Sequence, residues 1–141
     1  MRAILMAAIG ALAIGTANDA LAANPPSALE SARRDFAAAV GAHDIGGIVK
    51  LSRFPIAVEM YQYPRAISEK KFRTDRETFT DLFGDADAAI VRCIARGPLS
   101  LQSDAKQFGY GSWYADCNGN EYFFSPVRGR WLFTGYQNIN E

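Results

Sequence analysis

The sequence predicts an α+β domain in which N-terminal helices pack on a curved, mainly antiparallel sheet that ends in a three-stranded meander. Capped amphipathic segments recur between residues 27 and 97, and residues 56–62 alternate with the two-residue period of a strand. Three aromatic-rich runs follow between Gln107 and Asn138, separated by two turn signals. Helices followed by a run of strands are typical of the α+β class.

The meander carries the most register information in the chain. Asn118-Gly119 favours a two-residue primed turn, and Gly129 supplies a positive φ for a second, longer loop. A two-residue turn places Cys117 opposite Asn120, so one face carries Trp113, Ala115, Cys117, Tyr122 and Phe124 and the other Tyr110, Ser112, Tyr114, Phe123 and Ser125. Because both faces contain aromatic side chains, we expect one to contact helices and the other a ligand, a second subunit or a partner.

The first residues have the form of an export signal. Arg2 precedes an apolar stretch at residues 3–15, and Ala20-Leu21-Ala22 has the small-x-small pattern of a processing site. This apolar stretch is too short to span a bilayer. We therefore expect cleavage after Ala22, one domain over residues 23–141, and a periplasmic or extracellular location.

The charge balance gives no reason to expect a polyanionic partner. Lysine plus arginine number 15, as do aspartate plus glutamate. Nucleic acid and anionic membrane surfaces attract a basic excess, which is lacking here. The basic residues between Arg65 and Arg76 alternate with acidic ones, as on a solvated surface. No segment after the leader is apolar enough to cross a membrane.

The two cysteines, Cys93 and Cys117, both lie in the exported part of the chain. In an oxidising compartment their expected state is one disulfide bond. The alternative is a pair of buried free thiols.

Two predicted helices precede the first strand. Ser27-Ala28-Leu29-Glu30 has the capping-box pattern and opens a helix over Ala28–Ala42. Asp44 is the expected cap of a shorter helix that reaches Leu51, although Gly46-Gly47 weakens it.

Phe54-Pro55 favours extended geometry and introduces the strand at residues 56–62. A brief edge strand is expected within Ala66–Phe72. Thr74-Asp75-Arg76-Glu77 has a second capping-box pattern, and Gly84 ends the helix that it opens. Asp85 or Asp87 caps a last helix that Gly97-Pro98 closes, with a strand through Ile90-Val91 as the alternative.

Several apolar positions resemble those of the nuclear-transport-factor-two-like superfamily, which includes SnoaL-type and ketosteroid-isomerase-like proteins. They are Phe36 and Val40, Leu51 with Phe54-Pro55, Phe79 with Phe83, and Gly109-x-Gly111-x-Trp113. The resemblance covers about residues 29–138 and is nearest to exported bacterial members without an assigned activity. It implies a cone-like sheet wrapped around the first helix, a pocket at its open end and a dimer interface on its outer face. An immunoglobulin-like sandwich or a small inhibitor fold is the alternative.

Few residues have the pattern of a catalytic set. His43 lies beside Asp44 at a predicted helix end, where an imidazolium is favoured by the helix dipole and adjacent side chains rarely meet. Glu59 and Tyr61 share the strand face opposite Ile56 and Val58, and in an apolar pocket they would supply a proton acceptor and a hydrogen-bond donor. An outward-facing glutamate on an edge strand is the simpler interpretation. The isomerases' aspartate base and tyrosine donor have no matching positions here.

Metal and phosphate sites are not predicted. One histidine and two distant cysteines do not compose a usual zinc set, and Asp85 with Asp87 lacks the later ligands of a calcium loop. The segment Gly109–Trp113 lacks the third glycine and the lysine of a phosphate-binding loop.

These observations favour a non-catalytic exported module that binds a small apolar ligand or a protein partner and needs no cofactor. Trp113, Tyr110 and Tyr114 are its candidate binding residues. The alternative is a small isomerase- or hydrolase-type enzyme that uses Glu59 and Tyr61. A homodimer formed through the outer sheet face is a third expectation.

Overall fold

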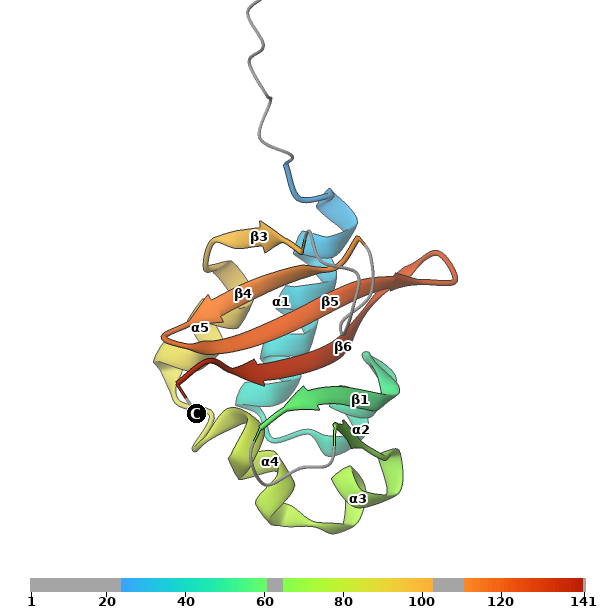
Figure 1. Cartoon of the computed structure of the whole chain (residues 1–141), viewed down its shortest axis with the longest axis vertical. Coiled ribbons are helices and arrows are strands. Elements are labelled where there is room, and N and C mark those ends of the chain that lie inside the picture. Colours follow the sequence, from blue (N-terminus) through green and yellow to red (C-terminus); the bar gives the residue numbers. More distant parts are fainter. Residues whose placement is uncertain (1–23, 61–64, 103–110, 141) are drawn as a thin grey trace, which may run out of the picture.

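One six-stranded mixed sheet, with helices against one of its faces, organises the part of the chain that the structure describes (Figure 1). The computed structural model describes residues 24–60, 65–102 and 111–140. In chain order its elements are α1 (Ser27–Gly41), α2 (Ile45–Lys50), β1 (Ser52–Glu59), β2 (Ala66–Ile67), α3 (Glu69–Thr74), α4 (Arg76–Phe83), α5 (Ala88–Arg96), β3 (Leu99–Leu101), β4 (Trp113–Cys117), β5 (Asn120–Val127) and β6 (Arg130–Asn138).

The sheet is mainly antiparallel, as predicted, and it is curved and open. Its strand order is β2-β1-β6-β5-β4-β3. The first strand, β1, runs parallel to the last, β6, whereas every other neighbouring pair is antiparallel. The sheet ends in the predicted meander of β4, β5 and β6, which confirms the α+β class.

The register of β4 against β5 is the predicted one, whereas the second turn consists of Arg128 and Gly129 alone and is shorter than expected. Cys117 pairs with Asn120 and Trp113 with Phe124, with Asn118 and Gly119 both at positive φ in the turn between them. One feature of β6 was not predicted. Phe124 pairs with Phe133 but Phe123 pairs with Gly135, so Thr134 is the extra residue of a β-bulge.

The inner face of the sheet packs against α1, which Figure 1 shows running behind β4, β5 and β6. Phe36 of α1 is fully buried, and its ring lies 4.6 Å from that of Phe133 and 5.5 Å from that of Phe124. It also contacts Phe83 of α4 edge-on at 5.9 Å. Phe36 therefore joins the first helix, the fourth helix and the sheet in one core.

Two further links hold the helices on this inner face. Cys93 of α5 and Cys117 of β4 form a disulfide bond, with their Cα atoms 5.8 Å apart, which confirms the predicted pairing. The hydroxyl of Tyr122 on β5 donates a hydrogen bond of 2.7 Å to the carbonyl oxygen of Leu82 on α4. Burial raises the pKa of the Tyr122 hydroxyl, so it stays a donor at neutral pH.

Two local predictions at helix starts were wrong. Among the described residues no side-chain hydrogen bond caps α1, whose N-cap is Pro26, so Ser27 is a helical residue and not a cap. The cap of α4 is Asp75 rather than Thr74, and its side chain accepts from the amide of Glu77. The brief edge strand expected within Ala66–Phe72 is confirmed as β2, but the short helix α3 that follows it was not predicted; Ser68 caps this helix by accepting from the amide of Lys71.

None of the helices in the described ranges has the length and apolar character needed to cross a bilayer.

Candidate functional site

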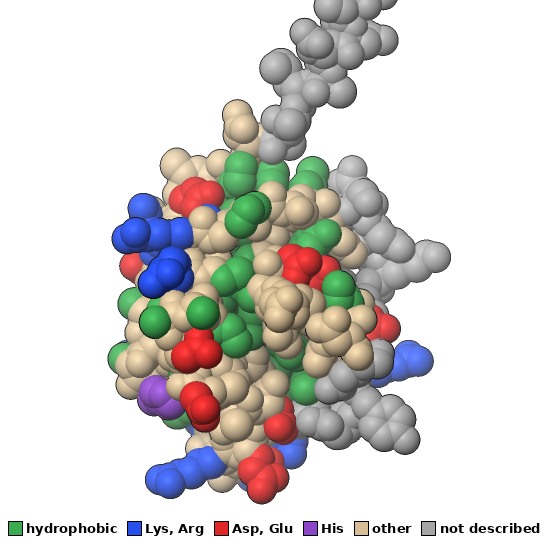
Figure 2. Space-filling view, turned by 90° about the vertical axis from the view of Figure 1, so that its left-hand side faces the viewer, with side chains coloured by type: hydrophobic (Ala, Val, Ile, Leu, Met, Phe, Trp, Pro, Cys, Tyr) green, Lys and Arg blue, Asp and Glu red, His purple; other side chains and the backbone are tan. Residues whose placement is uncertain are grey.

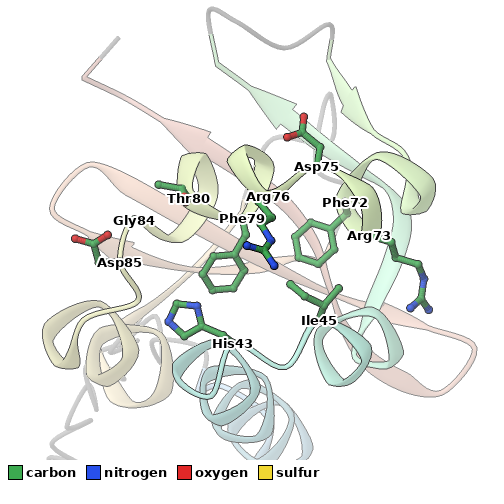
Figure 3. A pocket seen from close by; sticks show the side chains of 10 residues that line it. All are labelled: His43, Ile45, Phe72, Arg73, Asp75, Arg76, Phe79, Thr80, Gly84 and Asp85. Carbon is green, nitrogen blue, oxygen red and sulfur yellow. The ribbon is translucent and has the colours of Figure 1, made fainter.

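A groove opens at the end of the molecule where the turn between α1 and α2 meets α3 and α4 (Figure 3). Its volume is about 590 Å³, which lies within the usual size range of small-molecule sites. The residues that line it are His43, Ile45, Phe72, Arg73, Asp75, Arg76, Phe79, Thr80, Gly84 and Asp85.

The floor of the groove is an extension of the core. Phe79 is 6% exposed, and its ring lies 5.2 Å from that of the fully buried Phe83. Phe72 is likewise buried and contacts Phe54 of β1 at 5.8 Å between ring centroids. Because these rings are held from below by packed neighbours, the apolar floor is preformed.

His43 forms one wall of the groove. Its imidazole stacks on Phe79, with 4.7 Å between ring centroids and 29° between ring planes. The residue has a φ of 51° where the chain leaves α1, and its amide donates to the carbonyl oxygen of Val40. The chain's single histidine is exposed and is the purple side chain in Figure 2. One ring face is thus covered by Phe79 while the histidine remains accessible.

The carboxylate of Asp44 caps α2 and does not orient the imidazole of His43. It accepts a hydrogen bond of 2.9 Å from the amide of Gly47 and so caps α2, as predicted. The two neighbouring side chains therefore have separate structural partners and do not form a base-and-orienter pair.

Two of the charged residues that line the groove are held by neighbours. Arg73 pairs with Glu69 at 3.0 Å, and Asp75 pairs with Lys71 at 2.9 Å. The hydrogen bond from Lys71 is the main reason why the pKa of the Asp75 carboxyl lies below its ordinary value. Figure 3 shows both Arg73 and Asp75 directed away from the groove.

Arg76 differs from these two residues. Within the described ranges no side-chain hydrogen bond or ion pair engages its guanidinium. Figure 3 shows its side chain directed toward the middle of the groove, in the direction of Phe79 and Phe72. Asp85, on the other side, points outward. The charge that faces into the groove is therefore positive.

Glu59 is not among the residues that line this groove. It is exposed at the end of β1, on the sheet face opposite the core residue Val58, and it pairs in register with Gln137 of β6. The proposed proton acceptor therefore does not lie in an apolar pocket. Its suggested companion, Tyr61, lies outside the described residues.

The three candidate binding aromatics do not form one surface. Trp113 belongs to the inner face and is 6% exposed within the core. Tyr114 is half-buried on the outer face, where its ring lies 5.0 Å from that of Phe123. Tyr110 lies outside the described residues. Trp113 is thus a packing residue, and Tyr114 is the candidate that remains for an outer-face contact.

Polar side chains accompany Tyr114 on the outer face. The hydroxyls of Ser112, Ser125 and Thr134 form a chain of hydrogen bonds, each of 2.6 Å. Farther along the strands, Asp116 pairs in register with Glu121. Partial burial, and secondarily the Asp116 carboxylate, raises the pKa of the Glu121 carboxyl.

No group of three or more histidine, cysteine, aspartate or glutamate side chains among the described residues has an arrangement that suits a metal ion.

Sequence reasoning missed this groove because it is formed by helix ends that meet only in the folded chain. A signal for one of its walls was present. Ser68 followed by Glu69, with Lys71 and Arg73 near the end of the segment, has the cap and charge order of a short helix. Phe72 is then the buried residue of α3, which follows the edge strand β2.

Comparisons with protein-family models, with curated proteins and with solved structures give no significant match to this chain.

Proposed function

We propose that this chain is an exported, non-catalytic binding module and that the groove between α2, α3 and α4 is its binding site. The observation that carries the proposal is a preformed apolar floor beside an accessible histidine and an arginine that has no ion pair with any described residue. Ligand sites commonly combine apolar walls with a few convergent polar groups. The groove has this composition.

Export is part of the same proposal. The disulfide bond between Cys93 and Cys117 suggests an oxidising environment, in which such bonds form and persist. The leader sequence that ends at Ala22 supplies a route to that environment. Mass spectrometry of the exported protein tests this part, because the mature chain is expected to begin at Ala23.

The resemblance to the nuclear-transport-factor-two-like superfamily remains part of the proposal. A curved sheet with the first helix against its inner face is the arrangement that the resemblance implies. The implied dimer through the outer face is tested by sedimentation, which would show a two-subunit species that the Tyr114→Arg substitution dissociates. A monomer at all concentrations would contradict the dimer and would leave the groove unaffected.

The binding site itself is tested by heteronuclear NMR with phenol, indole and phenylacetamide as aromatic probes. We expect the probes to shift the amide signals of α3, α4 and the α1–α2 turn. His43→Ala should weaken this binding because it removes the exposed ring beside the floor. Glu59→Gln is the matched control, since Glu59 is exposed on the other side of the sheet.

A result with the opposite pattern would overturn the proposal. If Glu59→Gln weakened binding while His43→Ala did not, the site would lie on the outer face near β1. That outcome would favour the enzyme that uses Glu59 and Tyr61.

A further inference from the structure

The free charge inside the groove limits what it can hold. Of the charged side chains that line it, Arg73 and Asp75 have ion-pair partners on α3, and they point away, as Asp85 does. Arg76 points inward and has no ion pair among the described residues. An unpaired guanidinium beside an apolar floor requires an anionic partner if a ligand is to cover it without a large desolvation cost.

Helix stability does not explain why an arginine stands at this position. Arg76 is the first residue of α4, directly after the N-cap Asp75. The N-terminal end of a helix carries partial positive charge, so a cation there is disfavoured. The acidic Glu77 of the same turn has the sign that the helix prefers. The inward arginine is thus mildly unfavourable for the helix, and a role in binding accounts for it.

The shape of the remaining surface points to an apolar, ring-sized group. Phe79 and Phe72 form the floor, and the imidazole of His43 lies nearly parallel to the Phe79 ring. Flat aromatic walls favour flat or compact apolar groups through stacking and area burial.

We infer that the groove binds a carboxylate attached to an apolar, ring-sized group, an inference that depends on the groove being the binding site proposed above. The planar guanidinium of Arg76 donates hydrogen bonds to the carboxylate of the ligand, because its paired N–H groups match the two carboxylate oxygens. The ring lies on Phe79 beside His43. A monoanion suits this site better than a phosphate dianion, because a single arginine of the described part of the chain faces it and Asp85 lies at its edge.

Phenylacetate and its uncharged amide, phenylacetamide, test the inference. NMR titration should show tighter binding of the acid, and Arg76→Gln should weaken acid binding by about tenfold, as for a lost charged hydrogen bond. Arg73→Gln is the matched control, since it removes the same charge from a neighbour that points away and pairs with Glu69. It should change the affinity by less than about twofold.

Thermal unfolding separates a binding role from a structural one. Arg76→Gln should leave the melting temperature unchanged or slightly higher, because it removes a cation from the first turn of α4. A lowered melting temperature together with weaker amide binding would mean that Arg76 supports the groove structurally, which would overturn the inference.

The titrations also distinguish the proposal that the groove is a binding site from the inference that it binds a carboxylate. If acid and amide shifted the groove amides with equal affinity, the groove would remain a binding site and the carboxylate inference would be wrong. If Arg76→Gln and Arg73→Gln weakened the binding of phenylacetate equally, the effect would be due to the net charge of the protein. That result would also contradict the carboxylate inference. If neither compound shifted a groove amide, both proposals would fall.

Two kinds of ligand carry a carboxylate next to an apolar ring: a free small acid, and the C-terminus of a chain that ends in an aromatic residue. A short peptide that ends in phenylalanine, compared with its amidated form, distinguishes them. Tighter binding of the free-acid peptide than of phenylacetate would assign the site to chain termini. Tighter binding of phenylacetate would assign it to small acids. If the amidated peptide bound as tightly as the free acid, the inference would be contradicted.

Discussion

Loss of the disulfide bond between Cys93 and Cys117 should cost this domain a large share of its stability. The bond closes a loop with a sequence separation of 24 residues. In the chain-entropy relation, a loop of this length destabilises the unfolded state by about 3.5 kcal/mol at room temperature. Domains of this size have total stabilities of roughly 5–15 kcal/mol, so the loss would be visible in any unfolding measurement.

Urea denaturation of the oxidised protein, the reduced protein and the Cys93→Ala/Cys117→Ala variant measures this loss. Reduction keeps both sulfur atoms in the core, so it isolates the cross-link from the cavity left by the alanines. Both forms should lose about 3–4 kcal/mol, with a larger denaturant dependence because the unlinked chain unfolds further. A loss below about 1 kcal/mol in both forms would mean that the cross-link does not stabilise the domain by restricting its unfolded chain.

The remaining predictions concern buried contacts and charges that the structure explains. Glu121→Gln should raise the melting temperature at neutral pH, because a carboxyl whose pKa is raised in the folded state destabilises that state once ionised; a gain that persisted unchanged below the carboxyl pKa would contradict this. Tyr122→Phe should cost about 1–3 kcal/mol in urea unfolding, because it leaves the Leu82 carbonyl oxygen without its donor, and a neutral result would show that water replaces the hydroxyl. Asp87→Ala should cost about 1 kcal/mol, since the Asp87 carboxylate caps α5 at the amides of Ala89 and Ile90, whereas Asp87→Asn should cost less; equal costs would exclude capping as the cause.

Local sequence rules predicted the sheet well where a two-residue period and a turn type act together. The turn at Asn118-Gly119 fixes the register of β4 and β5, and that register decides which side chains reach the core. These features depend on short-range geometry, which the sequence encodes directly. The disulfide bond between Cys93 and Cys117 was predicted on another ground, the oxidising compartment to which the leader directs the chain.

Features that depend on competition between neighbouring signals were predicted less well. Ser27 and Thr74 each have the side chain of a cap, yet α1 begins directly after Pro26 and Asp75 is a stronger acceptor next to Thr74. The bulge at Thr134 was not predicted, because its position holds neither glycine nor proline. In the structure the hydroxyl of Thr134 forms a hydrogen bond with that of Ser125.

The candidate site was not predicted from the sequence, because its residues come from separate segments. Glu59 and the aromatic residues of the meander were the predicted site residues, because the two-residue period of a strand shows which side chains share a face. The groove instead brings together His43 from the turn after α1, Phe72 from α3, and Arg76 and Phe79 from α4. Their proximity follows from how α3 and α4 turn back toward the end of α1, and no single segment contains that information.

A crystal structure of the full chain in complex with phenylacetate would show where the ligand binds. We expect the aromatic ring to lie on Phe79 beside His43, with the carboxylate against the guanidinium of Arg76. Phenylacetate on the outer face near Tyr114, with the groove empty, would contradict it.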